Sequence, residues 1–128
     1  MRGSCHCGNV VYEADISFDM PTLRCNCSIC TKGRNWILPM EAHRLTVLKG
    51  GESIRVYTFG EGSIEHCFCP QCGIKTFGRS TEKLPLHPLV AINVATLDVS
   101  PEDFMKFGIT YLDGRHDRQE PPDITSYL

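Results

Sequence analysis

Residues 24–32 read RCNCSICTK and place three cysteines, Cys25, Cys27 and Cys30, close together in the chain. Thiols at this spacing can form a redox switch, begin a disulfide framework or bind a metal ion. A closed structural zinc site has four protein ligands, whereas a catalytic site has three and keeps one position open. The stretch therefore raises the question of what completes its ligand set.

Two further cysteine clusters stand on either side of this stretch. The sequence Cys-His-Cys-Gly occupies residues 5–8, and Cys-Phe-Cys-Pro-Gln-Cys-Gly occupies residues 67–73. Cys-Pro-Gln-Cys-Gly has the form of a zinc knuckle, in which two cysteines bind the ion from a tight turn and the glycine takes a positive φ. The simplest partition gives a closed site of four thiolates, made by Cys5, Cys7, Cys69 and Cys72.

The composition favours metal over disulfides as the role of these eight cysteines. The N-terminal residues lack the apolar segment of a secretory signal, and no apolar run is long enough to cross a bilayer, so we expect a cytoplasmic protein. Clustered cysteines in a reducing compartment usually bind metal or act in catalysis. A disulfide within Cys-x-Cys would also close a strained ring. Iron is an alternative to zinc on spacing alone.

The charge balance bears on the partners. A formal net charge of -2 leaves no basic excess to neutralise a phosphate backbone, so we expect no nucleic-acid partner.

With 128 residues, of which 41% are hydrophobic, the chain fits one domain with a modest core. A structural zinc site contributes an apparent ~10–16 kcal/mol to the folding of small domains, and we expect the four-thiolate site to support this core.

The local patterns predict a mainly β fold. Segments 9–16, 53–60 and 88–97 are rich in β-branched and aromatic residues, and Gly60–Gly62 separates two segments that can form a hairpin. Residues 49–52 read as a turn, and residues 41–44 as a short helical turn. Ser100 and Pro101 are typical of a helix start, here over residues 100–107, and the tail at about 114–128 is expected to be extended or poorly ordered.

Cys67 remains outside the simplest partition. If residues 64–69 form a strand, Cys67 and Cys69 share a face, which would put Cys67 beside the first metal. Cys67 or a nearby histidine can instead close the second site, but we favour a site with its fourth position open to substrate. A buried or free thiol is the preferred interpretation of Cys67.

The segments GSCHCG (3–8), CNCSIC (25–30) and FCPQCG (68–73), in this order, resemble the glutathione-dependent formaldehyde-activating enzyme family, to which centromere protein V also belongs. LDGRHD (112–117) is a weaker match. The resemblance implies a Mss4-like fold of several small coiled antiparallel sheets with two zinc ions. It implies structural roles for Cys5, Cys7, Cys69 and Cys72, and catalytic zinc binding by Cys25, Cys27 and Cys30.

The activity implied by the resemblance is that of a carbon–sulfur lyase that forms or cleaves S-(hydroxymethyl)glutathione, with glutathione as the thiol partner. A thiolate bound at an open zinc position can add to an aldehyde carbonyl. Arg24, Lys32 and Arg34 are candidates to bind the carboxylates of the tripeptide, although a solvated basic stretch explains them equally well.

Other residues and functions stay open at this stage. His66 is a candidate general acid or base, but a structural role fits a strand position better, and a lone Trp36 is more often core than pocket wall. The alternative function is a non-catalytic zinc-binding module that contacts a protein partner. A thiol redox enzyme is a third possibility and would need a low pKa at Cys67.

Overall fold

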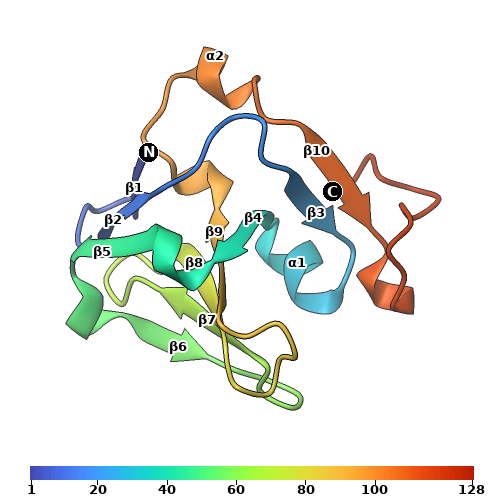
Figure 1. Cartoon of the computed structure of the whole chain (residues 1–128), viewed down its shortest axis with the longest axis horizontal. Coiled ribbons are helices and arrows are strands. Elements are labelled where there is room, and N and C mark those ends of the chain that lie inside the picture. Colours follow the sequence, from blue (N-terminus) through green and yellow to red (C-terminus); the bar gives the residue numbers. More distant parts are fainter.

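Ten strands in two sheets make up most of the regular structure of the computed structural model, which describes all of residues 1–128 (Figure 1). A three-stranded sheet has the order β1-β2-β5, and a seven-stranded sheet has the order β10-β3-β4-β9-β8-β7-β6. The strands are β1 Arg2–Ser4, β2 Val11–Ala14, β3 Thr22–Cys25, β4 Trp36–Glu41, β5 Leu45–Lys49, β6 Arg55–Tyr57, β7 Ile64–Phe68, β8 Lys75–Ser80, β9 Leu89–Asn93 and β10 Ile109–Leu112. The predicted mainly β fold is correct.

The one strand pairing that the sequence predicted, a hairpin across Gly60–Gly62, is present in the structure. β6 and β7 form the expected hairpin, with Tyr57 opposite His66 and positive φ at Gly60 and Gly62. All neighbouring strands are antiparallel except β10, which runs parallel to β3. The antiparallel sheets that the resemblance implied therefore have one parallel exception, β10, whose partner β3 is reached only after a long connection.

Helices are few and short. α2 covers Pro101–Phe104, shorter than the predicted 100–107, and its N-cap is as expected, because the backbone N–H of Asp103 donates to Ser100 Oγ at 3.2 Å. α1 covers Ser28–Gly33, and the sequence analysis did not predict it. The 3₁₀ turns are η1 Ala42–Arg44, η2 Gly51–Ser53, η3 Val94–Thr96 and η4 Gly114–His116, of which η1 and η2 lie where turns were expected.

The main core lies between the two sheets. Tyr12 is fully buried, packs edge-on against Phe77 with ring centroids 6.1 Å apart, and bonds to Thr96 through its hydroxyl at 2.8 Å. Trp36 Nε1 donates to Thr22 Oγ1 at 2.7 Å, and its half-buried ring packs against Phe104 and Phe107 at the side of the core and lines neither cavity beside α1. These contacts join the long sheet to the segment that carries α2.

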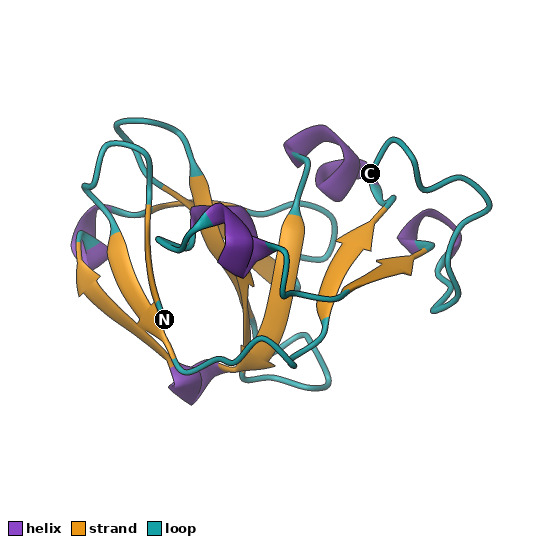
Figure 2. Cartoon of the chain, turned by 90° about the horizontal axis from the view of Figure 1, so that it is seen from above, coloured by secondary structure: helices purple, strands orange, loops and turns teal.

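The C-terminal residues turn back onto the rest of the chain. Residues 113–118 form η4 and a bridge between Asp113 and Arg118, so the expectation of an extended tail is wrong for this part. The C-terminus lies beside α1 (Figure 2), where Arg34 Nη1 donates to the carbonyl oxygen of Tyr127 at 2.5 Å. None of the helices has the length and apolar character needed to span a membrane.

Candidate functional site

The first cysteine cluster joins the end of β1 to the turn after β7. The thiol sulfurs of Cys5, Cys7, Cys69 and Cys72 all lie within 4.8 Å of one another. The Cys5–Cys7 and Cys7–Cys69 sulfur distances are 3.7 Å and 3.6 Å. A tetrahedral zinc with Zn–S bonds of about 2.3 Å requires sulfurs about 3.8 Å apart, so the four residues fit this ion.

Backbone N–H groups point at the sulfurs of this cluster. The N–H of Val10 lies 3.2 Å from Cys5 Sγ, and that of Gln71 lies 3.4 Å from Cys69 Sγ. Such bonds offset the negative charge of four thiolates. Because Cys5 and Cys69 are buried and the ligand set is complete, the cluster has the properties of a structural site.

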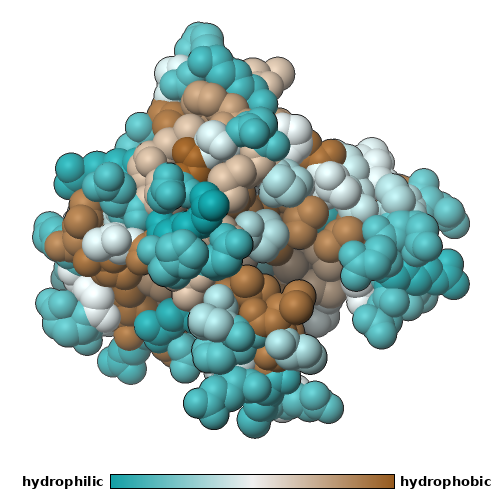
Figure 3. Space-filling view, in the orientation of Figure 1, coloured by the Kyte–Doolittle hydropathy of each residue, from teal (hydrophilic) through white to brown (hydrophobic).

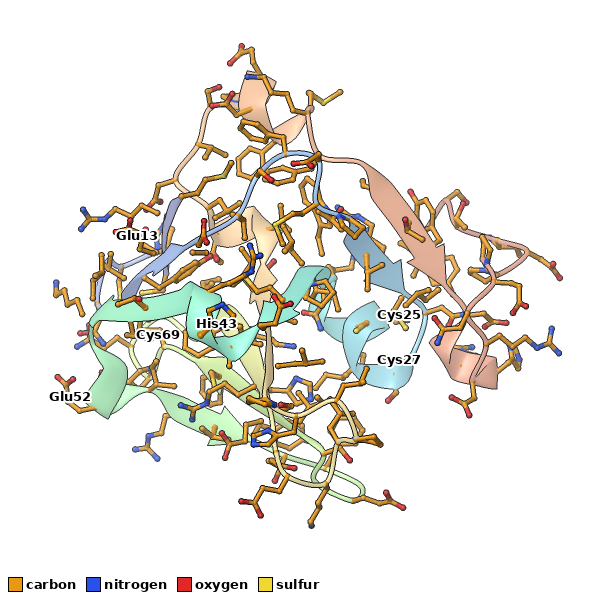
Figure 4. The ribbon with its side chains drawn as sticks, viewed as in Figure 1. Glu13, Cys25, Cys27, His43, Glu52 and Cys69 are labelled. Atoms are coloured by element: carbon orange, nitrogen blue, oxygen red, sulfur yellow. The ribbon has the colours of Figure 1, made fainter.

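The second cluster forms where β3 passes into α1. The sulfurs of Cys25, Cys27 and Cys30 lie within 4.8 Å of one another, because Cys25 ends β3 and α1 turns Cys30 back toward Cys27. Figure 4 shows Cys25 and Cys27 together beside α1, well apart from Cys69. The N–H of Cys27 and the amide of Asn35 lie 3.4 Å and 3.6 Å from Cys25 Sγ and Cys30 Sγ.

Cys27 is the thiol of this cluster whose pKa is lowered, whereas burial raises the pKa of Cys25. The neighbouring Cys30 thiol lowers the pKa of Cys27 to about 5, against the opposing effect of burial, and the backbone N–H groups of Cys30 and Ile29 act in the same direction. Three thiols, of which one ionises readily, are a suitable donor set for zinc.

The C-terminal segment supports the second cluster, which the sequence analysis did not predict. Asn26 is buried between the cysteines; its Nδ2 donates to Asp113 Oδ1 at 2.7 Å, and its Oδ1 accepts from the N–H of Arg115 at 2.8 Å. A Cβ on Gly114 would lie 2.5 Å from Cys25 Sγ, so only glycine fits there. The hydrogen bond from Asn26, assisted by His116, lowers the pKa of Asp113. In the sequence, the LDGRHD segment (112–117) was the feature that could have indicated this contact.

No fourth protein ligand approaches the second cluster, since no further His, Cys, Asp or Glu groups with these three sulfurs. Cys67 lies in the main core, and its thiol faces the carbonyl of Glu65 at 3.7 Å. The strand ends at Phe68 with a bulge after Cys67, so the condition for placing Cys67 beside the first cluster is not met, and the preferred interpretation of a buried thiol is confirmed. Burial raises the pKa of Cys67, which removes the support for a redox enzyme.

A cavity of about 440 Å³ opens beside the second cluster. Cys27 and Cys30 line it together with His66 and Lys75, which β7 and β8 supply. Lys75 Nζ lies 2.9 Å from His66 Nδ1, and burial together with this ammonium lowers the pKa of His66 to about 4. His66 is therefore neutral at pH 7 and accepts a hydrogen bond from Lys75. The sequence analysis did not single out Lys75.

A second, more polar cavity of about 650 Å³ adjoins the first. Ile29, Phe59 and Lys75 line both cavities. The polar side chains of the second cavity are those of Ser28, Lys32, Asn35, Tyr57, Lys75 and Asn93. It has two ammonium groups and no carboxylate, a balance that suits an anionic ligand.

The three basic residues predicted to bind substrate have different positions. Lys32 lines the polar cavity, whereas Arg24 lies over the Trp36 ring at 5.2 Å and Arg34 binds the tail. A larger cavity of about 860 Å³ lies among the C-terminal residues. It contains charges of both signs and no cysteine lines it, so the two cavities beside α1 are the better candidates for the reaction.

Fold and site together define a small β protein with a closed four-thiol cluster and an open three-thiol cluster. The family model described as "Glutathione-dependent formaldehyde-activating enzyme" matches residues 1–107. A Rhodobacter sphaeroides protein, whose crystal structure was determined as a structural genomics target, is similar at 33% sequence identity and a TM-score of 0.70, covering 86% of this chain and 100% of that one. The chain belongs to the glutathione-dependent formaldehyde-activating enzyme family.

Proposed function

We propose that the protein is a zinc-dependent carbon–sulfur lyase that forms or cleaves the adduct of glutathione with an aldehyde. The observation that carries the proposal is the three-thiol cluster, which has no fourth protein ligand and whose Cys27 and Cys30 line a cavity with a lysine–histidine pair. Cys25, Cys27 and Cys30 would hold the catalytic zinc, and Cys5, Cys7, Cys69 and Cys72 the structural one. Bound zinc supplies a low pKa for a coordinated thiol.

In this proposal Lys75 transfers the proton and His66 orients the Lys75 side chain. As the glutathione sulfur bonds to the carbonyl carbon, the C=O π electrons move to oxygen, and Lys75 Nζ donates a proton to that oxygen. In the reverse direction the hydroxyl proton returns to Lys75, the C=O bond re-forms and the sulfur leaves with the bonding electrons. His66 orients the ammonium through the 2.9 Å contact at Nδ1.

The polar cavity is the proposed site of the tripeptide. Lys32 would pair with a carboxylate of the tripeptide and Asn35 would bind an amide, whereas Lys75, which lines both cavities, is reserved for the proton transfer. Arg24 and Arg34 have partners elsewhere, so we assign them supporting roles. We place the reaction in the cytoplasm, where glutathione is reduced.

The test combines metal analysis with glutathione titration of the cobalt-substituted protein. We expect two metals per chain and a change in the visible thiolate–cobalt spectrum on adding glutathione. Lys75→Met should lower kcat of adduct cleavage by about 100-fold, within the range of general acid–base effects. The matched control is Lys106→Met, because Lys106 pairs with Asp103 on the α2 segment. No spectral change would favour a non-catalytic zinc module instead.

A further inference from the structure

The cavity beside the second cluster is larger and more apolar than a one-carbon aldehyde requires. Besides Cys27, Cys30 and the lysine–histidine pair, its lining is mainly Ile29, Ile37, Phe59, Ile64 and Ala91. Its volume is about 440 Å³, within the ~300–1,000 Å³ typical of sites for small organic ligands. Formaldehyde has two heavy atoms and would fill a small part of this space, given that one water molecule takes about 30 Å³. Hydrophobic side chains also gather near the centre of the face in Figure 3, in the region of α1.

Aromatic rings form one wall of this cavity. Phe59 stacks on His66 with centroids 5.6 Å apart and on Tyr57 with centroids 5.9 Å apart. Tyr57 and Phe59 are nevertheless 52% and 46% exposed, so the stack presents a large aromatic surface to whatever occupies the cavities. Exposed rings of this kind gain from covering by an apolar ligand.

The two cavities differ in the polarity of their linings. The polar one carries two ammonium groups and suits the carboxylates of a tripeptide, whereas the apolar one offers a single carboxyl-bearing residue, Glu61, among aliphatic and aromatic side chains. Lys75 lines both and so lies where the sulfur of the tripeptide would meet the carbonyl group.

We infer that the carbonyl partner is a hydrophobic aldehyde, with an alkyl chain or ring that occupies the apolar cavity between Phe59 and Ala91. The inference rests on the proposed lyase function and specifies its substrate class. The step is unchanged: the S–C bond forms, the C=O π bond breaks and the carbonyl oxygen takes a proton from Lys75 Nζ. No oxidant or reductant is needed.

Stable thioethers of glutathione test the inference by binding. S-Methylglutathione and S-hexylglutathione, titrated calorimetrically into the zinc-loaded protein, differ by five methylene groups. Each fully buried methylene strengthens binding about fourfold, so partial burial in an open cavity should make the hexyl compound at least about 10-fold tighter. Equal dissociation constants would overturn the inference.

Variants of the cavity lining test whether the alkyl group binds in the apolar cavity. Ala91→Leu fills the cavity and Phe59→Ala removes its aromatic wall, so each should reduce the hexyl-to-methyl preference to below about 3-fold. Val56→Ala is the matched control, because Val56 lies on the edge strand β6 shortly before Phe59, is 43% exposed and lines neither cavity. A preference that survives both Ala91→Leu and Phe59→Ala would place the alkyl group elsewhere and overturn the assignment.

Turnover separates this inference from the proposed function. Exchange between aldehyde and adduct, followed by NMR with formaldehyde and with hexanal, should be faster for hexanal relative to the uncatalysed rates. Catalysed exchange with formaldehyde but no gain for hexanal would overturn the inference and leave the lyase standing. A hexyl preference in binding without catalysed exchange of either aldehyde would overturn the lyase and leave an apolar ligand site.

Discussion

At the scale of single residues, Gly114 of the C-terminal segment lies directly against the second cluster. A side chain there would meet Cys25 Sγ, the nearest heavy atom, at 2.5 Å, and Cys27 Cβ at 3.2 Å. We predict that Gly114→Ala loses the second metal, or binds it about 10–100-fold more weakly, as expected when groups around metal ligands are disturbed. Native mass spectrometry should find one metal per chain.

Gly108→Ala is the control for this variant, because nothing lies within 4 Å of a Cβ at Gly108 and its backbone has no positive φ. It should retain two metals. If Gly114→Ala also retains both with wild-type affinity, the C-terminal segment does not shape the second site.

Tyr12 makes the stability depend on pH in the alkaline range. Burial raises its pKa to about 12 from 10.0, although the hydrogen bond with Thr96 opposes the shift. The native state therefore holds the phenol proton more tightly than the unfolded state, so this stabilisation is complete below pH 10 and is lost as the pH rises through 12. Urea unfolding from pH 8 to pH 11 should show a decline that is shallower in Tyr12→Phe. Parallel declines would contradict the assignment.

At the scale of elements, α1 and β10 show where sequence patterns fail. The hairpin of β6 and β7 and the capped start of α2 were predictable because glycines, Ser100 and Pro101 act locally. α1 has only six residues, contains no buried side chain and has no side-chain cap, so no helical periodicity identifies it. β10 pairs with β3 across most of the chain, and its partner is set by tertiary contacts.

Asn26 joins α1 to η4, because it lies shortly before α1 and bonds to Asp113, the N-cap of η4, and to Arg115 within it. Asn26→Ala should release η4 and lower the free energy of unfolding by about 1–3 kcal/mol, because the buried Asp113 carboxylate loses a donor. Hydrogen exchange should accelerate at residues 113–118 and not in β1 and β2. Unchanged exchange at residues 113–118 would show that other contacts hold η4.

At the scale of the whole molecule, the two clusters should contribute unequally to stability. The first joins β1 to the turn between β7 and β8, far apart in sequence, whereas the second holds α1 to the adjacent β3. Cys69→Ser should therefore lower Tm by at least about 10 °C, and Cys27→Ser by less than half as much. Calorimetry at one zinc concentration measures both.

Cys67→Ser is a useful third variant, because it changes a buried thiol that belongs to neither cluster and should leave two metals bound. Equal losses in Cys69→Ser and Cys27→Ser would mean that the second cluster also supports the fold as a whole.

The candidate site was predictable in part. Paired spacings brought Cys5 with Cys7 and Cys69 with Cys72, and the structure groups these four thiols and, separately, Cys25, Cys27 and Cys30. Lys75 escaped notice because an isolated lysine in a strand has no sequence signature, and its position beside His66 depends on the register of β7 and β8. The sequence also could not show that Lys32, and not Arg24 or Arg34, lines the polar cavity, because this depends on the partners that Arg24 and Arg34 find in the folded chain.

The parallel pairing of β10 with β3 affects how the chain matures during synthesis. A ribosome makes the chain from its N-terminus, so the four thiols of the first cluster have all been made once Cys72 has emerged. The three thiols of the second cluster are made much earlier. However, Asn26 cannot form its hydrogen bonds until Asp113 and Arg115 have been made, and Cys25 has no contact with Gly114 until then. The first cluster should therefore reach its final surroundings before the second, which becomes complete only when β10 docks on β3.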